Sequence, residues 1–298
     1  MELIDTHSHI YEPEFDEDRE AAVARAIENG VSTMLLPAID PASDERMFAL
    51  CRRHPECCLP MMGLHPTSVN DNPTWRSDLQ RVEGFLIRPP QGISRFYGVG
   101  EIGLDFYWSD RFVEEQTEAF VRQLRLAARF DLPAVIHTRA AWSRMAEIIE
   151  TETARARAGG YRLRGIFHAF SEDLQMYEQL RSCGEFLFGI GGVVTFRKSR
   201  LADTVREMAL DDLVLETDCP YLTPAPHRGE RNEPAYLRFV CQKIAEVKGL
   251  PAGEVASATT ANARRLFLGG GERRMQTGSA GFQDPCGETQ AVPEREKR

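Results

Sequence analysis

Residues 3–10 read LIDTHSHI, a short apolar run that ends in two histidines separated by one serine. Successive side chains of a strand point to opposite faces, so His7 and His9 would point the same way at the end of this strand. Neutral imidazole is a common ligand of Zn²⁺ and similar ions. Taken alone, the pair is equally compatible with two polar residues in a turn. Only other residues of the chain can distinguish a metal site from such a turn.

Seven more short apolar runs follow, and longer segments separate them. The eight predicted strands are residues 3–6, 31–36, 58–63, 96–102, 134–137, 165–168, 185–190 and 213–217. Several are apolar almost throughout, as parallel strands covered by helices are. Helical spacing of apolar residues predicts helices over residues 16–29, 74–86, 114–130 and 233–247. This alternation predicts an α/β protein, either a TIM-type (β/α)₈ barrel or a doubly wound sheet.

Four other polar residues favour the barrel. Glu101, His137, His168 and Asp218 each stand where an apolar run ends. In a (β/α)₈ barrel these positions lie on the C-terminal face, where active sites are built. One such histidine is more often a rim residue than a ligand. Five strands that all end in metal-compatible residues instead predict one shared metal site.

Length and charge limit the choices further. The chain has 298 residues, and roughly 250 suffice for one barrel, so we predict a single domain over residues 1–268. Residues 269–298 are rich in Gly, Pro and charge and are predicted to form a flexible tail. The net charge of −9 argues against a broad surface for polyanions. A small phosphate-binding pocket stays compatible with it, because bound metal ions carry their own positive charge.

The seven cysteines form no CxxC pair and are odd in number. This argues against a disulfide framework or a zinc ribbon and fits reduced thiols. The N-terminus, MELIDTHSHI, lacks the basic and apolar segments of a signal peptide. No stretch approaches the roughly 18 apolar residues of a membrane helix. We therefore expect a soluble cytoplasmic protein without a membrane partner, with a monomer as the default state.

The chain resembles the TatD family of metal-dependent deoxyribonucleases and hydrolases, within the amidohydrolase-like barrels. The matching segments follow the family's order and cover nearly all of the chain up to Leu268. They are IDTHSHI (4–10), GLHP (63–66), GEIGLDFY (100–107), LPAVIHTR (132–139), GIFHAFS (165–171), GIGGVVTF (189–196), LVLETDCPYLTPAPHRGERNEP (213–234) and TTANARRLF (259–267). Two positions near the expected mouth depart from the family's pattern, Ala169 for its usual Cys and Ala140 for its usual Asp. Substrate preference can therefore differ from that of the nuclease members.

The resemblance implies a ligand set for two divalent ions. His7, His9 and Asp218 would surround one ion, His137 and His168 the other, and Glu101 would bridge them. The nitrogen-rich set suits Zn²⁺ or Mn²⁺, whereas Mg²⁺ prefers oxygen. The family's nucleases are nonetheless associated with Mg²⁺, so the metal is left open among the three.

The expected function is hydrolysis of phosphodiester bonds, with nucleotides removed from a DNA 3′ end. Asp218 would orient the attacking water and take its proton, with Glu101 as the second catalytic carboxylate. One alternative is hydrolysis of an amide, ester or lactone. The other alternative is a barrel that binds metal without catalysis. Candidate substrate contacts are His65, Arg139 and Arg228, since arginine can hold a phosphate with two hydrogen bonds. Structural roles for them are a helix entry before Pro66 and salt bridges within loops.

Three further features have structural interpretations. Residues 189–192, GIGG, lack the Lys-Ser/Thr pair of a phosphate-binding P-loop and predict a tight turn from strand to helix. Cys219 is predicted to be a buried, inert thiol. Phe106, Tyr107 and Trp108 could stack on a base or cover the barrel rim.

Overall fold

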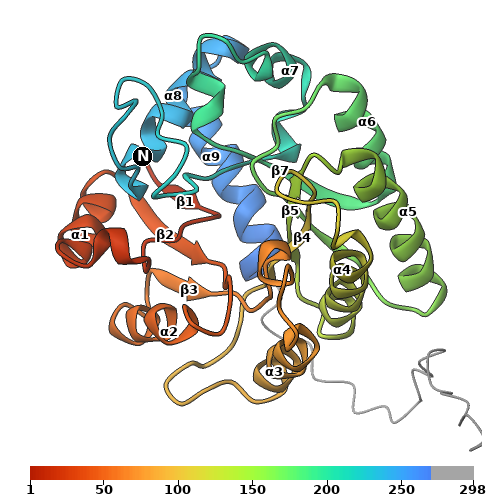
Figure 1. Ribbon diagram of the computed structural model, residues 1–298. Helices are drawn as coiled ribbons and strands as arrows, with labels where there is room; N and C mark the ends of the chain where they lie inside the picture. The colour runs from red at the N-terminus through yellow and green to blue at the C-terminus, as the bar shows by residue number, and fades with distance from the viewer. Residues whose placement is uncertain (270–298) are drawn as a thin grey trace, which may run out of the picture.

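Eight parallel strands form the centre of the protein, which a computed structural model describes over residues 1–269 (Figure 1). Along the chain they are β1 (Leu3–Asp5), β2 (Val31–Leu36), β3 (Cys58–Pro60), β4 (Val99–Asp105), β5 (Ala134–Arg139), β6 (Arg164–Phe167), β7 (Glu185–Ile190) and β8 (Leu213–Leu215). The order β1-β2-β3 forms one hydrogen-bonded sheet, and β4-β5-β6-β7-β8 forms the other. Together they make the predicted (β/α)₈ barrel.

Single bridges, not ladders, join the two sheets. On one side Met62, just past β3, pairs with Val99 of β4. On the other side the Thr6 amide donates to the Leu215 carbonyl over 3.0 Å, and Ser8 pairs with Cys219. The second seam matters for function, because it sets the residues after β1 beside those after β8.

Helices cover the outside of the strands, as parallel sheets require (Figure 1). Within the described residues they are α1 (Arg19–Glu28), α2 (Asp44–Arg53), α3 (Trp75–Ile87), α4 (Val113–Arg129), α5 (Trp142–Ala158), α6 (Leu174–Cys183), α7 (Leu201–Glu207), α8 (Leu237–Lys248) and α9 (Ala252–Ala263). The four helices expected from apolar spacing are α1, α3, α4 and α8, and the last begins four residues later than predicted because Pro234–Tyr236 forms a 3₁₀ turn.

Three predicted strand ranges need correction. The strand expected over residues 96–102 is β4 and runs from Val99 to Asp105, because Leu104 and Asp105 pair with Thr138 and Arg139 of β5. The strands expected over residues 58–63 and 213–217 stop after three residues. Beyond them the chain turns into the loops that carry polar side chains.

Apolar side chains from seven strands fill one half of the barrel interior. They pack together as Ile4, Leu35, Leu59, Val135, Ile166, Leu187 and Val214. Leu266 and Phe267, which follow α9, pack against this cluster and close the amino end of the barrel. The interior is therefore solid at that end, and polar chemistry is confined to the carboxyl end.

The segment predicted to be a flexible tail, residues 269–298, lies outside the described residues except for Gly269. The domain boundary at residue 268 stays a prediction. Within residues 1–269, no helix combines the length and the apolar character that crossing a membrane demands.

Candidate metal centre

The six predicted ligands converge toward the carboxyl ends of β1, β4, β5, β6 and β8, although Glu101 and His137 lie inside β4 and β5 and not at their ends as expected. On one side of the centre, Nε2 of His7 lies 3.1 Å from Oε2 of Glu101, and Nε2 of His9 lies 3.5 Å from the same oxygen. Oδ1 of Asp218 lies 3.8 Å from Nε2 of His7 and 3.7 Å from Nε2 of His9. The closure of β1 against β8 makes this possible, since the Asp218 amide donates to the His7 carbonyl over 2.9 Å.

The other oxygen of Glu101 faces a second group of histidines. Oε1 lies 3.0 Å from Nδ1 of His137, 3.5 Å from Nε2 of His65 and 3.8 Å from Nε2 of His168. The His168 ring also reaches Asp218, with 3.5 Å between Nε2 and Oδ1. The Glu101 carboxylate thus stands between two sets of imidazoles, one on each oxygen.

These side chains fit divalent cations better than they fit one another. Nε2 of His7 and Nε2 of His9 face each other at 3.1 Å, and the His7 ring stacks on the His168 ring with 3.4 Å between centroids. One proton can satisfy a pair of ring nitrogens but not the whole group, and the residues are almost fully buried. Three sets of three residues at this centre have ligand atoms within 4.8 Å of one another: His7, His9 and Glu101; His65, Glu101 and His137; and His7, His168 and Glu216. Imidazole with carboxylate suits Zn²⁺ or Mn²⁺.

The electrostatics of the centre are those of a site that needs a cation. Burial opposes the charge on Glu101, but His7 and His65 hold its pKa well below the ordinary value. Burial raises the pKa of Asp218 to about 6. Burial lowers the pKa of His137, but Asp105 and Glu101 outweigh it and raise this pKa to about 9. Burial also lowers the pKa of His168, but Glu216 and Asp218 raise it to about 10. Without a metal, protons on these two imidazoles supply the positive charge.

Three residues that the sequence did not single out orient the histidines. Oδ2 of Asp105 lies 3.0 Å from Nε2 of His137, and the Tyr11 hydroxyl lies 2.9 Å from Nδ1 of His9. A carboxylate or hydroxyl behind a ligating histidine fixes its tautomer and ring orientation. Asp105 ends the motif GEIGLD, so its place at the end of β4 was a usable signal.

Glu216 is the third, and it reaches His168 across β7. Its Oε1 lies 3.0 Å from Nδ1 of His168, although the two are not aligned as a hydrogen bond, and it accepts the Ala169 amide over 2.6 Å. Gly189 of β7 makes this contact possible, because a Cβ there would lie 2.0 Å from Oε2 of Glu216. Gly189 is thus a strand residue, and the turn predicted over residues 189–192 begins only at Gly191.

Left-handed backbone follows three of the ligand-bearing strands. Asp218, Ala169 and Ala140 have φ values of 56°, 48° and 54°. Asp adopts this conformation more readily than Ala does. The two departures from the family's pattern therefore fall at turns where the backbone is constrained. At Ala169 the hydrogen bond from its amide to Glu216 helps to hold that turn.

The predicted substrate contacts lie in different surroundings. His65 caps the 3₁₀ turn Pro66–Ser68 through Nδ1, which is the structural role expected for a residue at a helix entry. Its Nε2 also faces Glu101. Arg139 is exposed at the end of β5, next to the centre. Arg228 packs its guanidinium 3.7 Å from the centroid of the Phe196 ring and donates to the Thr223 carbonyl, which ties it to its own loop.

Two smaller expectations are also resolved. Cys219 is fully buried, its Sγ lies 3.1 Å from the Ser8 hydroxyl, and burial raises the pKa of the thiol. It is therefore the inert thiol that the sequence suggested. Phe106 packs against the core, whereas Tyr107 and Trp108 are exposed.

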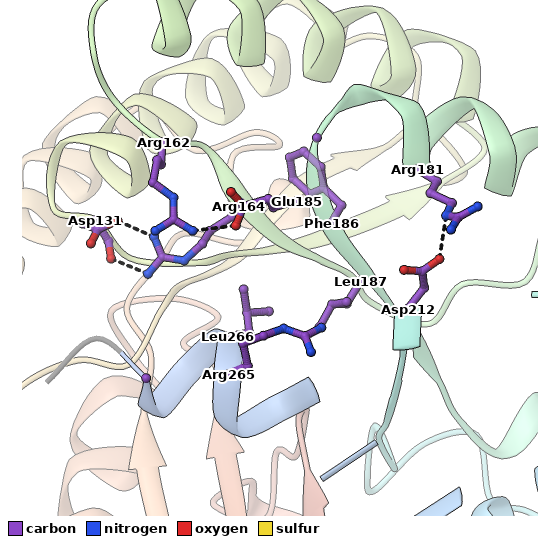
Figure 2. A pocket seen from close by; sticks show the side chains of 12 residues that line it. Asp131, Arg162, Arg164, Arg181, Glu185, Phe186, Leu187, Asp212, Arg265 and Leu266 are labelled. Carbon is purple, nitrogen blue, oxygen red and sulfur yellow. Dashed lines mark hydrogen bonds and ion pairs between the residues drawn. The ribbon is translucent and has the colours of Figure 1, made fainter. Parts of the chain in front are cut away.

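A hollow of about 640 Å³ lies at the opposite, amino end of the barrel (Figure 2). Its charged lining consists of four arginines and three carboxylates that neutralise most of them: Arg162, Arg164, Arg181, Arg265, Asp131, Glu185 and Asp212. Arg162 pairs with Glu185 over 2.5 Å, and Arg181 pairs with Asp212 over 2.7 Å. Arg164 pairs with Asp131. These pairs join segments at or before the starts of β5 to β8 to one another and to the last turn of α6, and none of the predicted site residues lies among them.

Comparison with known proteins agrees with this geometry. The family model for TatD related DNase matches residues 4–268. An uncharacterized metal-dependent hydrolase of Bacillus subtilis, YabD, is 32% identical over 266 residues, which are 89% of this chain and 98% of the relative. The 3′-5′ ssDNA/RNA exonuclease TatD of Erwinia tasmaniensis is 31% identical over 270 residues, with 89% and 99% of the two chains covered.

Solved structures show the same relationship. The crystal structure of YjjV, a TatD homologue from Escherichia coli, superposes with a TM-score of 0.78 at 31% identity and covers 89% of this chain and 98% of its own. Both the sequence relatives and this structure cover 89% of the chain, and the family model spans residues 4–268. The chain therefore belongs to the TatD-related DNase family and is a metal-dependent hydrolase of that family.

Proposed function

We propose that the protein is a 3′-5′ exonuclease that removes nucleotides from a single-stranded DNA end with two divalent ions. The observation that carries this proposal is the Glu101 carboxylate, which turns one oxygen to His7 and His9 and the other to His137 and His65. A carboxylate placed between two sets of nitrogen ligands suits a pair of ions. The relative from Erwinia tasmaniensis is named a 3′-5′ ssDNA/RNA exonuclease, which supports the choice of substrate.

The residues of this chain would divide the work as follows. His7, His9 and Asp218 would hold one ion, His137 and His168 would hold the other, and Glu101, which faces both sets, would contribute an oxygen to each. When bound, such ions stabilise the charge of a phosphodiester under attack and lower the pKa of water. Asp218 would be the general base, because its carboxylate is partly accessible at 15% and its Oδ1 lies at the centre, near His7 and His168. Glu101 would stay ionised beside the ions, since His7 and His65 already hold its pKa well below the ordinary value against the effect of burial.

His65 would lie next to the second ion. Its Nε2 points at Glu101 Oε1, and burial lowers the pKa of its ring, so the imidazole is neutral and can accept or coordinate. Monomeric state and cytoplasmic location stay predictions from the sequence.

The test is hydrolysis of a single-stranded oligonucleotide labelled at its 5′ end, with Mg²⁺, Mn²⁺ or Zn²⁺ supplied in turn. We expect a ladder of products that shorten from the 3′ end, abolished by EDTA and absent for the variant with both His137→Ala and His168→Ala. Full-length oligonucleotide under every ion, with turnover of an amide, ester or lactone instead, would overturn the exonuclease assignment and leave the metal-dependent hydrolase in place.

A further inference from the structure

Two large aromatic side chains stand exposed beside the metal centre. The loop between β4 and α4 presents Tyr107, with 59% of its surface accessible, and Trp108, with 66%. Their rings meet edge to face with 5.0 Å between centroids. The other two tryptophans, Trp75 and Trp142, are buried or partly buried, so Trp108 is the exposed tryptophan of residues 1–269.

Arg139 adds a cation to these rings. Its guanidinium carbon lies 3.7 Å from the centroid of the Tyr107 ring and 5.2 Å from that of Trp108. No carboxylate of residues 1–269 lies within ion-pair distance of it, in contrast to the arginines of the hollow at the amino end. A planar cation that is stacked but unpaired remains available to a phosphate.

Backbone and side-chain contacts fix this group relative to the metal centre. The Tyr107 amide donates to Oδ1 of Asp105 over 3.1 Å, and Oδ2 of the same carboxylate contacts His137. The Phe106 amide donates to the Arg139 carbonyl over 3.0 Å. Arg139 follows His137 by two residues, a chain distance of about 7 Å. The rings and the cation are therefore held at the edge of the centre.

We propose that Tyr107, Trp108 and Arg139 form a clamp for the nucleotide next to the bond that is cut, in which the Trp108 ring stacks on its base, the Tyr107 ring holds the Arg139 guanidinium in place, and Arg139 contacts a phosphate. This inference rests on the proposed exonuclease function and deepens it by naming what the site recognises: the open face of an unpaired base. Aromatic stacking accepts every base, because each has a π-face. The clamp therefore selects single-stranded ends without reading their sequence.

The test pairs a change in the protein with the matching change in the substrate. Wild type and Trp108→Ala are assayed on a single-stranded oligonucleotide and on copies that carry one abasic site at the first, second or third position from the 3′ end. Stacking on one base corresponds to about tenfold in binding. We expect Trp108→Ala to raise KM on the intact oligonucleotide about tenfold with little change in kcat, and one abasic position to raise the wild-type KM equally.

The variant and that abasic substrate together should show no further loss, because each removes the same contact. Trp108→Phe should restore stacking, whereas Arg139→Lys should keep the charge but lose the planar contact. Tyr161→Ala, at an exposed ring near the start of β6, is the matched control and should behave as wild type. Equal KM values for Trp108→Ala and wild type on the intact strand, with normal cleavage, would overturn the clamp alone. An intact strand that wild type does not cut would overturn the proposed function and the clamp with it.

Discussion

At the carboxyl end of the barrel, histidines crowd around Glu101 and Asp218 with their ring nitrogens only 3.0–3.8 Å from carboxylate oxygens and from one another. At the amino end, three arginines each face one carboxylate, as Arg181 faces Asp212 (Figure 2). Both ends gather charged groups at the starts or ends of the same strands. They differ in whether those groups satisfy one another.

The difference separates function from stability. Paired opposite charges need no further partner. The charged residues around the hollow at the amino end are therefore explained by the ion pairs that connect neighbouring elements, despite the size of the hollow. At the carboxyl end the ring nitrogens face one another as well as carboxylates, as those of His7 and His9 do at 3.1 Å, and the perturbed pKa values there are typical of a functional site. In (β/α)₈ barrels the carboxyl end carries activity and the amino end carries stability, and this chain follows that division.

The largest effect should come from matched double variants at the two ends. We expect His137→Ala with His168→Ala to lower kcat/KM by roughly 10³-fold or more, because several kcal/mol of charge stabilisation depend on bound metal. Arg162→Ala with Arg181→Ala removes two cations from the other end and should leave kcat/KM near the wild-type value. Circular dichroism checks that both proteins fold. Equal losses in the two proteins would erase the contrast between the ends.

A smaller effect is expected from two carboxylates that flank the same strand. Glu216 follows β8 and faces His168, whereas Asp212 precedes β8 and faces Arg181. Glu216→Gln should weaken metal binding about 10- to 100-fold, the usual cost of losing a carboxylate behind a ligating histidine. Asp212→Asn should leave the metal affinity unchanged. Titration with Zn²⁺ followed by a chelating dye measures both, and an unaltered affinity for Glu216→Gln would remove it from the metal centre.

The affinity of the carboxyl end for metal should depend on pH. The pKa values of about 9 for His137 and about 10 for His168 lie above the ordinary 6.5, so in the metal-free protein both rings are protonated at pH 7. A ligand must lose its proton to bind metal. Affinity should therefore rise at least about tenfold between pH 7 and pH 9, with protons released on binding. Calorimetry in buffers of different ionisation enthalpy would contradict this if no protons were released at pH 7.

The smallest expected effect is on stability, and it comes from breaking an ion pair at the amino end. Arg164 is 7% exposed, whereas its partner Asp131 has a half-exposed side chain, so solvent screens the pair. We expect Asp131→Asn to cost about 1 kcal/mol, a fall in Tm of about 2–4 °C for a protein of this size. Its kcat/KM should match wild type. A variant with unchanged Tm would show that the pair is not needed for stability.

The sequence was sufficient to predict the fold and the convergence of the six candidate ligands, whose role as ligands stays a prediction. Apolar runs located the eight strands, and the polar residues that end them placed His7, Glu101 and Asp218 on one face. Strand ends were less accurate. Leu104 and Asp105 continue β4 through pairing with β5, which no local pattern of residues 96–105 reveals.

The outer contacts of the centre could not be derived from spacing. Glu216 reaches His168 past β7 only because Gly189 has no side chain, and such a contact depends on three strands at once. Sequence reasoning likewise left Tyr107 and Trp108 between stacking and rim packing. Their exposure, with Arg139 against the rings, follows from how the loop after β4 meets the end of β5.

The most direct test of the account is to locate metal in crystals of the protein grown with Mn²⁺, using anomalous scattering. Two peaks should lie on either side of the Glu101 carboxylate, one near His7 and His9 and the other near His137, and the arginine-lined hollow should show none. An absence of peaks at Glu101, or ions bound only elsewhere on the barrel, would contradict the central claim.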